Sequence, residues 1–181
     1  FIFHPKLSLS LKVSPPDSTK IALFSMLGVK LYETYFFRLK IKNIGNRAAT
    51  GVEVLVDKVF EKKGKGFELV NGFLPLNLAW SNKNPRIETL PRILPNKLYA
   101  HCDFLHLERS ENNEIKLKID TIIDPTSPFN YLPVGTYRIQ TITSSNHMAP
   151  EYNLWEVTFD GILWETEEEE FSKGLAIKKL S

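Results

Sequence analysis

Apolar and polar residues alternate along most of the chain with a period of two, which is typical of β-strands. Between residues 7 and 14, Leu7, Leu9, Leu11 and Val13 alternate with serine and lysine. Because successive side chains of a strand point to opposite faces, such a run has one face for a core and one for solvent. Further strand-like runs lie at 35–42, 52–56, 98–108, 115–119, 136–143 and 154–159. The pattern predicts an all-β domain.

The connections between these runs favour a single domain over residues 1–181. Most of them are short and contain glycine, proline or asparagine, and no internal repeat or linker divides the chain. The longest connection, Asn82–Pro95, interleaves three prolines with Ile87, Leu90 and Ile93. This content predicts a loop packed against the domain, where it could cover an open sheet edge.

One segment near the C-terminus, WETEEEEFSKG, has the signature of a helix rather than a strand. Thr166 can cap a helix of about 167–173, and Glu169 can return a hydrogen bond to the threonine's backbone N–H. Lys173 lies in the last turn, and Gly174 is expected to supply a left-handed stop. The glutamate run is interpreted as a solvated face, because adjacent side chains diverge around a helix axis and do not converge on a calcium ion.

Two stretches resemble known β-sandwich families. The stretch YFFRLKIKNIGNRAATGVEVLV resembles bacterial immunoglobulin-like modules of the CARDB type, in its strand, N-x-G turn and second strand. LPVGTYRIQTITSSN is similar to the F-strand region of fibronectin type III modules, and this resemblance implies that Tyr137 forms a tyrosine corner. The resemblance implies an immunoglobulin-like antiparallel β-sandwich with a long packed loop and one short helix. In such modules the usual roles are spacing, adhesion and partner binding, with no shared functional residues.

Composition and charge narrow the choice of partner. The chain has 23 basic and 21 acidic residues, so its formal charge of +2 does not favour nucleic acid. A single cysteine excludes an internal disulfide framework and leaves both the cytoplasm and a bacterial envelope open as compartments. The opening FIFHPK is either an apolar first strand or the tail of a membrane helix upstream of Phe1, which would tether the domain.

The run HCDFLH, residues 101–106, contains the densest group of metal-ligand residue types. In a regular strand, His101 and Asp103 share one face, about 7 Å apart, and could converge on a metal ion given a third ligand. Cys102 and His106 would share the other face. Hydrogen bonding within the sheet is the competing interpretation for His101 and Asp103. A Cys102 nucleophile is disfavoured because no nearby positive charge lowers the pKa of the thiol.

Three tryptophans raise the question of ligand binding. Trp80 precedes the long loop and Trp164 adjoins the acidic helix, so either ring could stack on a sugar or anchor a partner. A buried loop anchor is the alternative for Trp80. Trp155 alternates with other apolar residues and is assigned to the core. Lysines of EKKGKGFE could touch phosphate, although a solvated hairpin turn is the simpler interpretation.

No motif in the chain fixes a reaction. G-x-S-x-G, Walker and G-x-G-x-x-G signatures are absent, and no cofactor is predicted. The leading hypothesis is a non-enzymatic interaction or sensory module with a protein partner, whose oligomeric state is open. One alternative is a domain that binds carbohydrate or a small polar ligand. Another is a metal-dependent hydrolase that uses His101 and Asp103.

Overall fold

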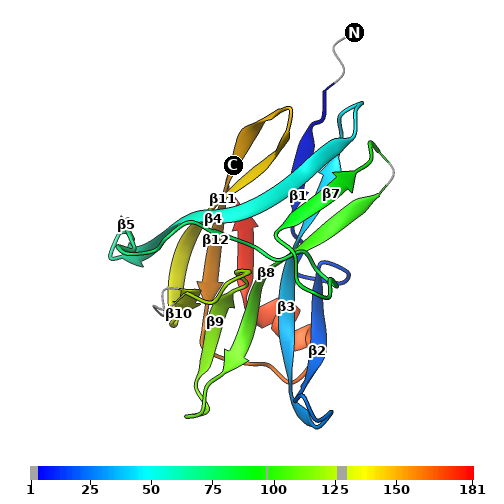
Figure 1. Ribbon diagram of the computed structural model, residues 1–181. Helices are drawn as coiled ribbons and strands as arrows, with labels where there is room; N and C mark the ends of the chain where they lie inside the picture. The colour runs from blue at the N-terminus through cyan, green and yellow to red at the C-terminus, as the bar shows by residue number, and fades with distance from the viewer. Residues whose placement is uncertain (1–3, 97, 126–129) are drawn as a thin grey trace.

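The computed structural model describes residues 4–96, 98–125 and 130–181, which form two antiparallel sheets packed face to face (Figure 1). The first sheet has the order β1-β3-β8-β9-β10, and β2 also pairs with β3. Its strands are β1 (Leu7–Ser10), β2 (Ser18–Phe24), β3 (Lys30–Asn43), β8 (Tyr99–Arg109), β9 (Ile115–Ile119) and β10 (Tyr131–Leu132).

The second sheet has the order β13-β12-β11-β4-β5, with β6 and β7 also paired to β4. Its strands are β4 (Ala49–Lys63), β5 (Gly66–Leu69), β6 (Leu76–Asn77), β7 (Thr89–Ile93), β11 (Gly135–Asn146), β12 (Met148–Phe159) and β13 (Ala176–Lys179). A short helix, α1 (Glu167–Lys173), precedes β13. The predicted all-β sandwich with one short helix is confirmed.

The core lies between the sheets and is built from the apolar side of each alternating strand. Leu39 and Ile41 of β3 and Val54 of β4 have no exposed surface. Phe104 from the first sheet packs against Trp155 from the second, with ring centroids 5.9 Å apart. Each large side chain buried in this way contributes about 2 kcal/mol, so the interface between the sheets is the main source of stability.

The segment predicted as a packed loop, Asn82–Pro95, is partly a strand. It contains β7, which pairs with β4 from Ala49 to Glu53, while β5 and β6 pair with other parts of the same long strand. The expectation that the segment covers a sheet edge is therefore confirmed. The expectation of a loop throughout is wrong, because the β4 backbone offers unpaired groups that the segment satisfies with a ladder of its own.

The two stretches that carry the family resemblance form specific turns. The Tyr137 hydroxyl donates a hydrogen bond to the backbone carbonyl of Pro133 at 2.9 Å, which is the geometry of a tyrosine corner. In the N-x-G turn, the buried Asn43 side chain donates to the carbonyls of Arg47 and Ile93. A Cβ at Gly45 would overlap the backbone around Pro5, so this position requires glycine.

The corner hydrogen bond predicts that Tyr137→Phe lowers the free energy of unfolding by about 1 kcal/mol, because the part-buried bond between the Tyr137 hydroxyl and the Pro133 carbonyl is lost. Urea unfolding measures the change. Tyr152→Phe is the matched control, since this ring is 61% exposed, and it should have no measurable effect. Equal effects of the two substitutions would show that the corner contributes nothing to stability.

Helix α1 has the predicted bounds and N-cap. The Thr166 hydroxyl accepts from the Glu169 N–H at 3.2 Å and donates to the Glu169 carboxylate, in place of the predicted return bond to the threonine backbone. Gly174 has a φ of −77°, so the left-handed stop is wrong. Glycine is needed there because a Cβ would overlap the Glu170 carboxylate.

Glu170 is an exception to the predicted solvated face. Its side chain is fully buried and accepts hydrogen bonds from the backbone N–H groups of Leu175 and Trp164. Burial raises the pKa of Glu170, although these two bonds act in the opposite direction. Glu167 and Glu168 are exposed as expected. Glu170 therefore ties the helix to its flanking segments.

The proposed membrane tether concerns Phe1–Phe3, which lie outside the described residues. In the part of the chain that the structure describes, no helix is long and apolar enough to cross a bilayer.

Candidate functional site

A β-bulge in β8 changes which side chains of HCDFLH face outward. Phe37 pairs with Leu105 and Arg38 with Asp103, so Phe104 is an extra residue opposite β3. Phe104 and Leu105 are both buried, and the alternation reverses after them. The prediction that His106 faces away from His101 and Asp103 is therefore wrong. All three lie on the outer face of the first sheet.

His101 and Asp103 are each held by different partners. The His101 Nε2 lies 3.0 Å from the buried Asp17 carboxylate. Asp103 accepts from the Ser81 hydroxyl at 2.6 Å and from the Arg38 Nε at 3.2 Å. Burial raises the pKa of Asp103, while the Ser81 hydrogen bond lowers it. A metal ion would have to displace these partners from both side chains.

His106 is the centre of a second polar cluster. Its Nδ1 lies 2.8 Å from Asp120 and its Nε2 lies 3.3 Å from Glu108, and its ring stacks on Phe36. Burial disfavours the charged ring, but the hydrogen bonds to Asp120 and Glu108 outweigh it and raise the pKa of His106 to about 9. The hydrogen bond from His106 lowers the pKa of Glu108 to about 2. Near neutral pH the cluster is therefore an imidazolium between two carboxylates.

This cluster predicts that stability falls as pH rises. The folded pKa of His106, about 9, lies above the ordinary value of 6.5, so its contribution is complete below pH 6.5 and is lost as pH passes 9. The expected loss is roughly 2 to 3 kcal/mol. Urea unfolding at pH 6.5 and 9.5 measures it, with His106→Gln as the control that should flatten this part of the profile. An unchanged profile in the variant would contradict the assignment.

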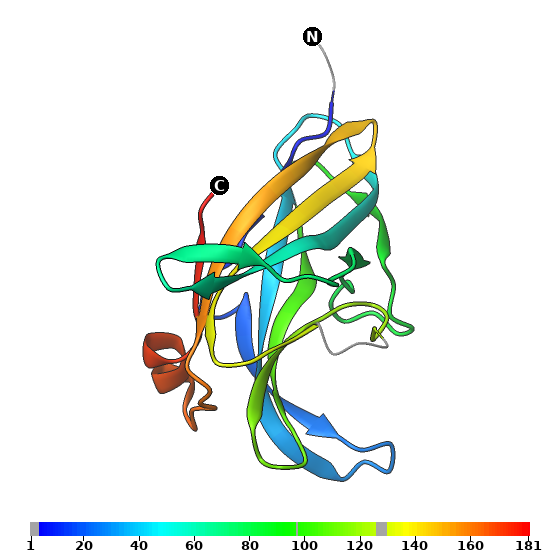
Figure 2. The same ribbon diagram turned by 90° about the vertical axis from the view of Figure 1, so that its left-hand side faces the viewer.

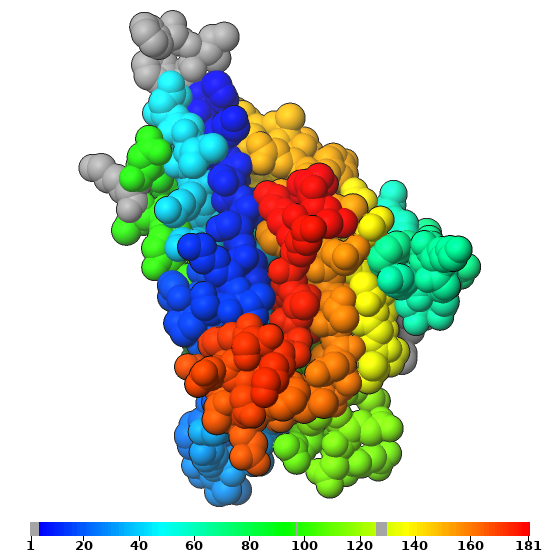
Figure 3. All heavy atoms as spheres, turned by 180° about the vertical axis from the view of Figure 1, so that it is seen from behind, coloured from blue at the N-terminus to red at the C-terminus, as the bar shows by residue number. Residues whose placement is uncertain are grey.

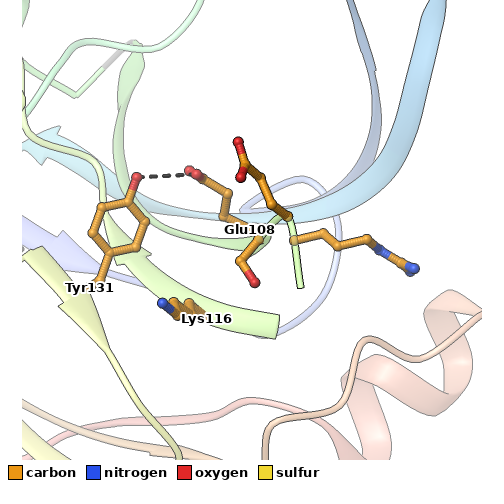
Figure 4. Close-up of a pocket in the computed structure, with 6 residues that line it drawn as sticks. Glu108, Lys116 and Tyr131 are labelled. Carbon is orange, nitrogen blue, oxygen red and sulfur yellow. Dashed lines mark hydrogen bonds between the residues drawn. The ribbon is translucent and has the colours of Figure 1, made fainter. Parts of the chain in front are cut away.

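Two shallow hollows lie next to these clusters. One, of about 380 Å³, is lined by Glu108, Lys116 and Tyr131 among others, and the Tyr131 hydroxyl donates to Glu108 at its wall (Figure 4). The other, of about 280 Å³, is lined by charged groups of both signs, including Arg86, Asp103 and Asp124. Among the described residues, no group of three or more His, Cys, Asp or Glu side chains is placed to hold a metal ion.

The remaining sequence candidates occupy different environments. Trp80 is 2% exposed and its indole N–H donates to the carbonyl of Glu88, so it anchors the long segment and presents no ring to a ligand. Trp164 is half-buried and lies 5.2 Å below the Lys173 ammonium, and its proposed ligand role stays a prediction. Cys102 is fully buried, and burial raises the pKa of its thiol. Such a thiol is a poor nucleophile.

The most unusual surface feature is the hairpin that joins β2 to β3. Its turn and the two adjoining strand ends carry five exposed apolar side chains, which we call the apolar tip: Phe24, Met26, Leu27, Val29 and Leu31. Leu27 is 91% exposed and Met26 fully exposed. The hairpin projects from the end of the sandwich opposite the N-terminus (Figures 2 and 3).

The apolar tip is ordered by its own hydrogen bonds. The Ser25 hydroxyl accepts from the N–H groups of Leu27 and Val29, and the Ser25 N–H donates to the Val29 carbonyl at 2.8 Å. Gly28 has a φ of +76°, which this turn requires and glycine adopts without strain. These bonds fix the backbone of the turn, which therefore presents its apolar side chains together to solvent.

The alternation of apolar and polar residues did not predict this hairpin. The available signal was FSMLGVKL, in which apolar residues surround a glycine turn where polar residues normally stand. STKIALF before it does not alternate clearly, and its burial pattern is correspondingly uniform. A run of apolar residues at a turn is the feature that marks an exposed contact surface.

The fold defines the protein as an antiparallel β-sandwich. Comparisons of the chain with protein-family models, with curated proteins and with solved structures find no match in any of the three. Its function therefore has to be inferred from its own surfaces.

Proposed function

We propose that this protein is a non-catalytic interaction module with an immunoglobulin-like sandwich, and that it binds a protein partner through the apolar tip. The single observation that carries the proposal is the presence of five largely exposed apolar side chains on the end of one hairpin, whose turn is closed by hydrogen bonds of Ser25. Surfaces of this kind are rare on monomers and are typical of contact sites.

The tip has the properties of a binding surface rather than of a folding element. Its side chains protrude beyond the sheets and bury little area within the molecule, so they contribute little to stability. Exposed apolar side chains lower the solubility of a protein, and folding does not require them at this position. The preformed turn lowers the entropy lost on binding, because few rotatable groups need to be ordered.

The immunoglobulin-like assignment is supported by two local features. The tyrosine corner at Tyr137 and the N-x-G turn at Asn43 both have the geometry that the resemblance implies. Modules of that class serve as spacers, adhesins and binding domains, which agrees with a surface dedicated to contact. An upstream membrane tether stays a prediction of this proposal.

Site-specific cross-linking tests the proposal. A photoreactive residue placed at Leu27 in the full chain should give a discrete covalent adduct in its native cells. The matched control is the same residue at Val134, which is 61% exposed in a separate part of the chain. Equal yields of the same adducts from both positions would mean that the tip has no dedicated partner.

A further inference from the structure

The end of the sandwich opposite the apolar tip brings five segments together. They are residues 4–10, 40–51, 91–96, 98–102 and 145–150, which we call the basic end. β1 and β8 both pair with the last residues of β3, while β7 and β11 both pair with the first residues of β4. The tip directly precedes β3, whose 14 residues span about 45 Å at 3.3 Å per residue, so the two surfaces lie at opposite poles of the molecule (Figure 1).

The basic end carries exposed cations and no carboxylate. Its segments contain no aspartate or glutamate. Four of its basic side chains are exposed, namely Lys6, Lys42, Arg47 and Arg92. Among the residues that the structure describes, none of these four forms an ion pair. Their charges are therefore available to an anion from outside the molecule.

The carboxylates next to these segments do not cancel this charge. Asp17 and Asp103 each form an ion pair with a neighbouring cation, at 3.9 and 3.2 Å. Glu53 and Glu151 come next along β4 and β12. They are outnumbered by the four exposed cations, so the basic end keeps a net positive charge.

Exposed aliphatic side chains lie among the cations. Ile44 is 48% exposed, Leu94 36% and Leu98 69%. Ile44 follows Lys42 by two residues at the end of β3, and Leu94 follows Arg92 by two residues at the end of β7. Basic side chains beside aliphatic ones suit the surface of an anionic bilayer, where the cations reach phosphates and the aliphatic groups enter the boundary with the acyl chains.

Nucleic acid fits this surface less well than lipid. Proteins that bind single strands stack the bases on exposed aromatic rings. Tyr99 is the sole phenylalanine, tyrosine or tryptophan in these segments. The Lys40 ammonium lies 4.2 Å from the centre of its ring, and the centre of the His101 ring lies 5.1 Å from it, edge to face. Tyr99 is therefore already engaged, and aliphatic side chains supply most of the exposed apolar surface.

We propose that the basic end binds the surface of an anionic phospholipid bilayer, with its four exposed cations at the lipid phosphates and its exposed aliphatic side chains in the interfacial layer. This site is separate from the apolar tip, so the inference goes beyond the proposed function and does not depend on it. The tip, at the opposite pole, then points away from the bilayer. The attraction is electrostatic and the insertion shallow, so binding is reversible and sensitive to salt.

Vesicle co-sedimentation of the full chain tests the inference. Wild type should sediment with phosphatidylcholine vesicles that contain about 30 mol% phosphatidylglycerol, and should stay in solution with phosphatidylcholine alone. The bound fraction should fall as salt rises from about 0.1 M to 1 M, because the Debye length shortens from about 10 Å to 3 Å. A wild-type protein that does not bind the anionic vesicles would overturn the inference.

Matched double variants locate the contact. The double variant Lys42→Glu, Arg47→Glu should bind anionic vesicles more than about twentyfold more weakly, because each basic residue near such a surface contributes roughly fivefold. The double variant Lys62→Glu, Lys65→Glu changes the net charge equally at two exposed lysines of the β4–β5 hairpin, and should bind within about threefold of wild type. Equal losses in the two double variants would mean that only net charge matters and would contradict the assigned surface.

Single variants distinguish the two poles. Leu98→Ser should weaken vesicle binding about fivefold, because an aliphatic side chain no longer leaves water on binding. Leu27→Asp, in the apolar tip, should bind anionic vesicles like wild type, and a loss in this variant would place the lipid contact at the wrong pole. Tighter binding of wild type to a single-stranded oligonucleotide than to anionic vesicles at the same salt would also overturn the inference. None of these results changes the cross-link through Leu27, which tests the proposed function separately.

Discussion

Asp120→Ala is expected to lower the free energy of unfolding by about 3 kcal/mol at pH 6.5. The substitution removes the partner of the His106 Nδ1, which lies 2.8 Å from the Asp120 carboxylate in a site where both side chains are less than a tenth exposed. The imidazolium then keeps only Glu108, and it must either remain charged without its closer partner or lose its proton. Urea unfolding at fixed pH measures the difference.

Asp120→Asn removes the negative charge of the side chain and keeps its shape, so it shows how much of the effect is due to charge. The amide oxygen can still accept from Nδ1, so the expected loss is smaller, about 1 to 2 kcal/mol. The pKa of His106, followed by NMR, should fall below its wild-type value of about 9 in both variants, because each lacks the Asp120 charge. If Asp120→Ala unfolds at the wild-type urea concentration, the cluster does not stabilise the fold.

The double substitution Met26→Asp, Leu27→Asp is expected to weaken partner binding by more than about thirtyfold, because two apolar groups at the centre of the contact become charged. The free energy of unfolding should change by less than about 0.5 kcal/mol, since both side chains are almost fully exposed. The partner is the protein recovered through the Leu27 cross-link, and its affinity is measured by titration against each purified variant.

The control for the double substitution is Leu74→Asp, which places a carboxylate on a surface leucine away from the hairpin. It should bind like wild type. If the double variant also binds like wild type, the tip is not the contact surface. If the urea midpoint of the double variant falls sharply, the tip side chains stabilise the fold, and their exposure is not evidence for a contact surface.

Much of the architecture was predictable from the sequence. Strands with clear alternation were found because a period of two specifies both the strand and its buried face. β11 is close to its predicted bounds, whereas β1 ends at Ser10 and is shorter than predicted, and β3 begins at Lys30 and is longer. The helix was predictable because its capping signal is local and involves only Thr166 and Glu169. β2 was missed because its side chains do not alternate between buried and exposed.

Two errors of the sequence prediction have different physical causes, one a contact between distant strands and the other a side chain four residues away. Alternation alone placed His106 and His101 on opposite faces of the sheet. The bulge at Phe104 puts them on the same face, because β8 pairs with β3 on both sides of the bulge. A single sequence does not show such pairing. Gly174 was assigned to a left-handed turn, whereas the Glu170 carboxylate occupies the space beside it. The first error comes from strand pairing, and the second comes from the burial of Glu170, which the glutamate run did not indicate.

The most direct test of the central claim uses the two methionines of the chain as probe and reference. Met26 is fully exposed in the apolar tip, whereas Met148 packs partly against the core. The measurement is the rate of sulfoxide formation at each, in dilute purified protein and in the native cells. If the tip is covered by a partner, the rate at Met26 relative to Met148 should fall about tenfold or more in cells, the ratio expected when nine-tenths or more of the protein is bound. An unchanged ratio would show that the tip is free and would contradict the proposed function.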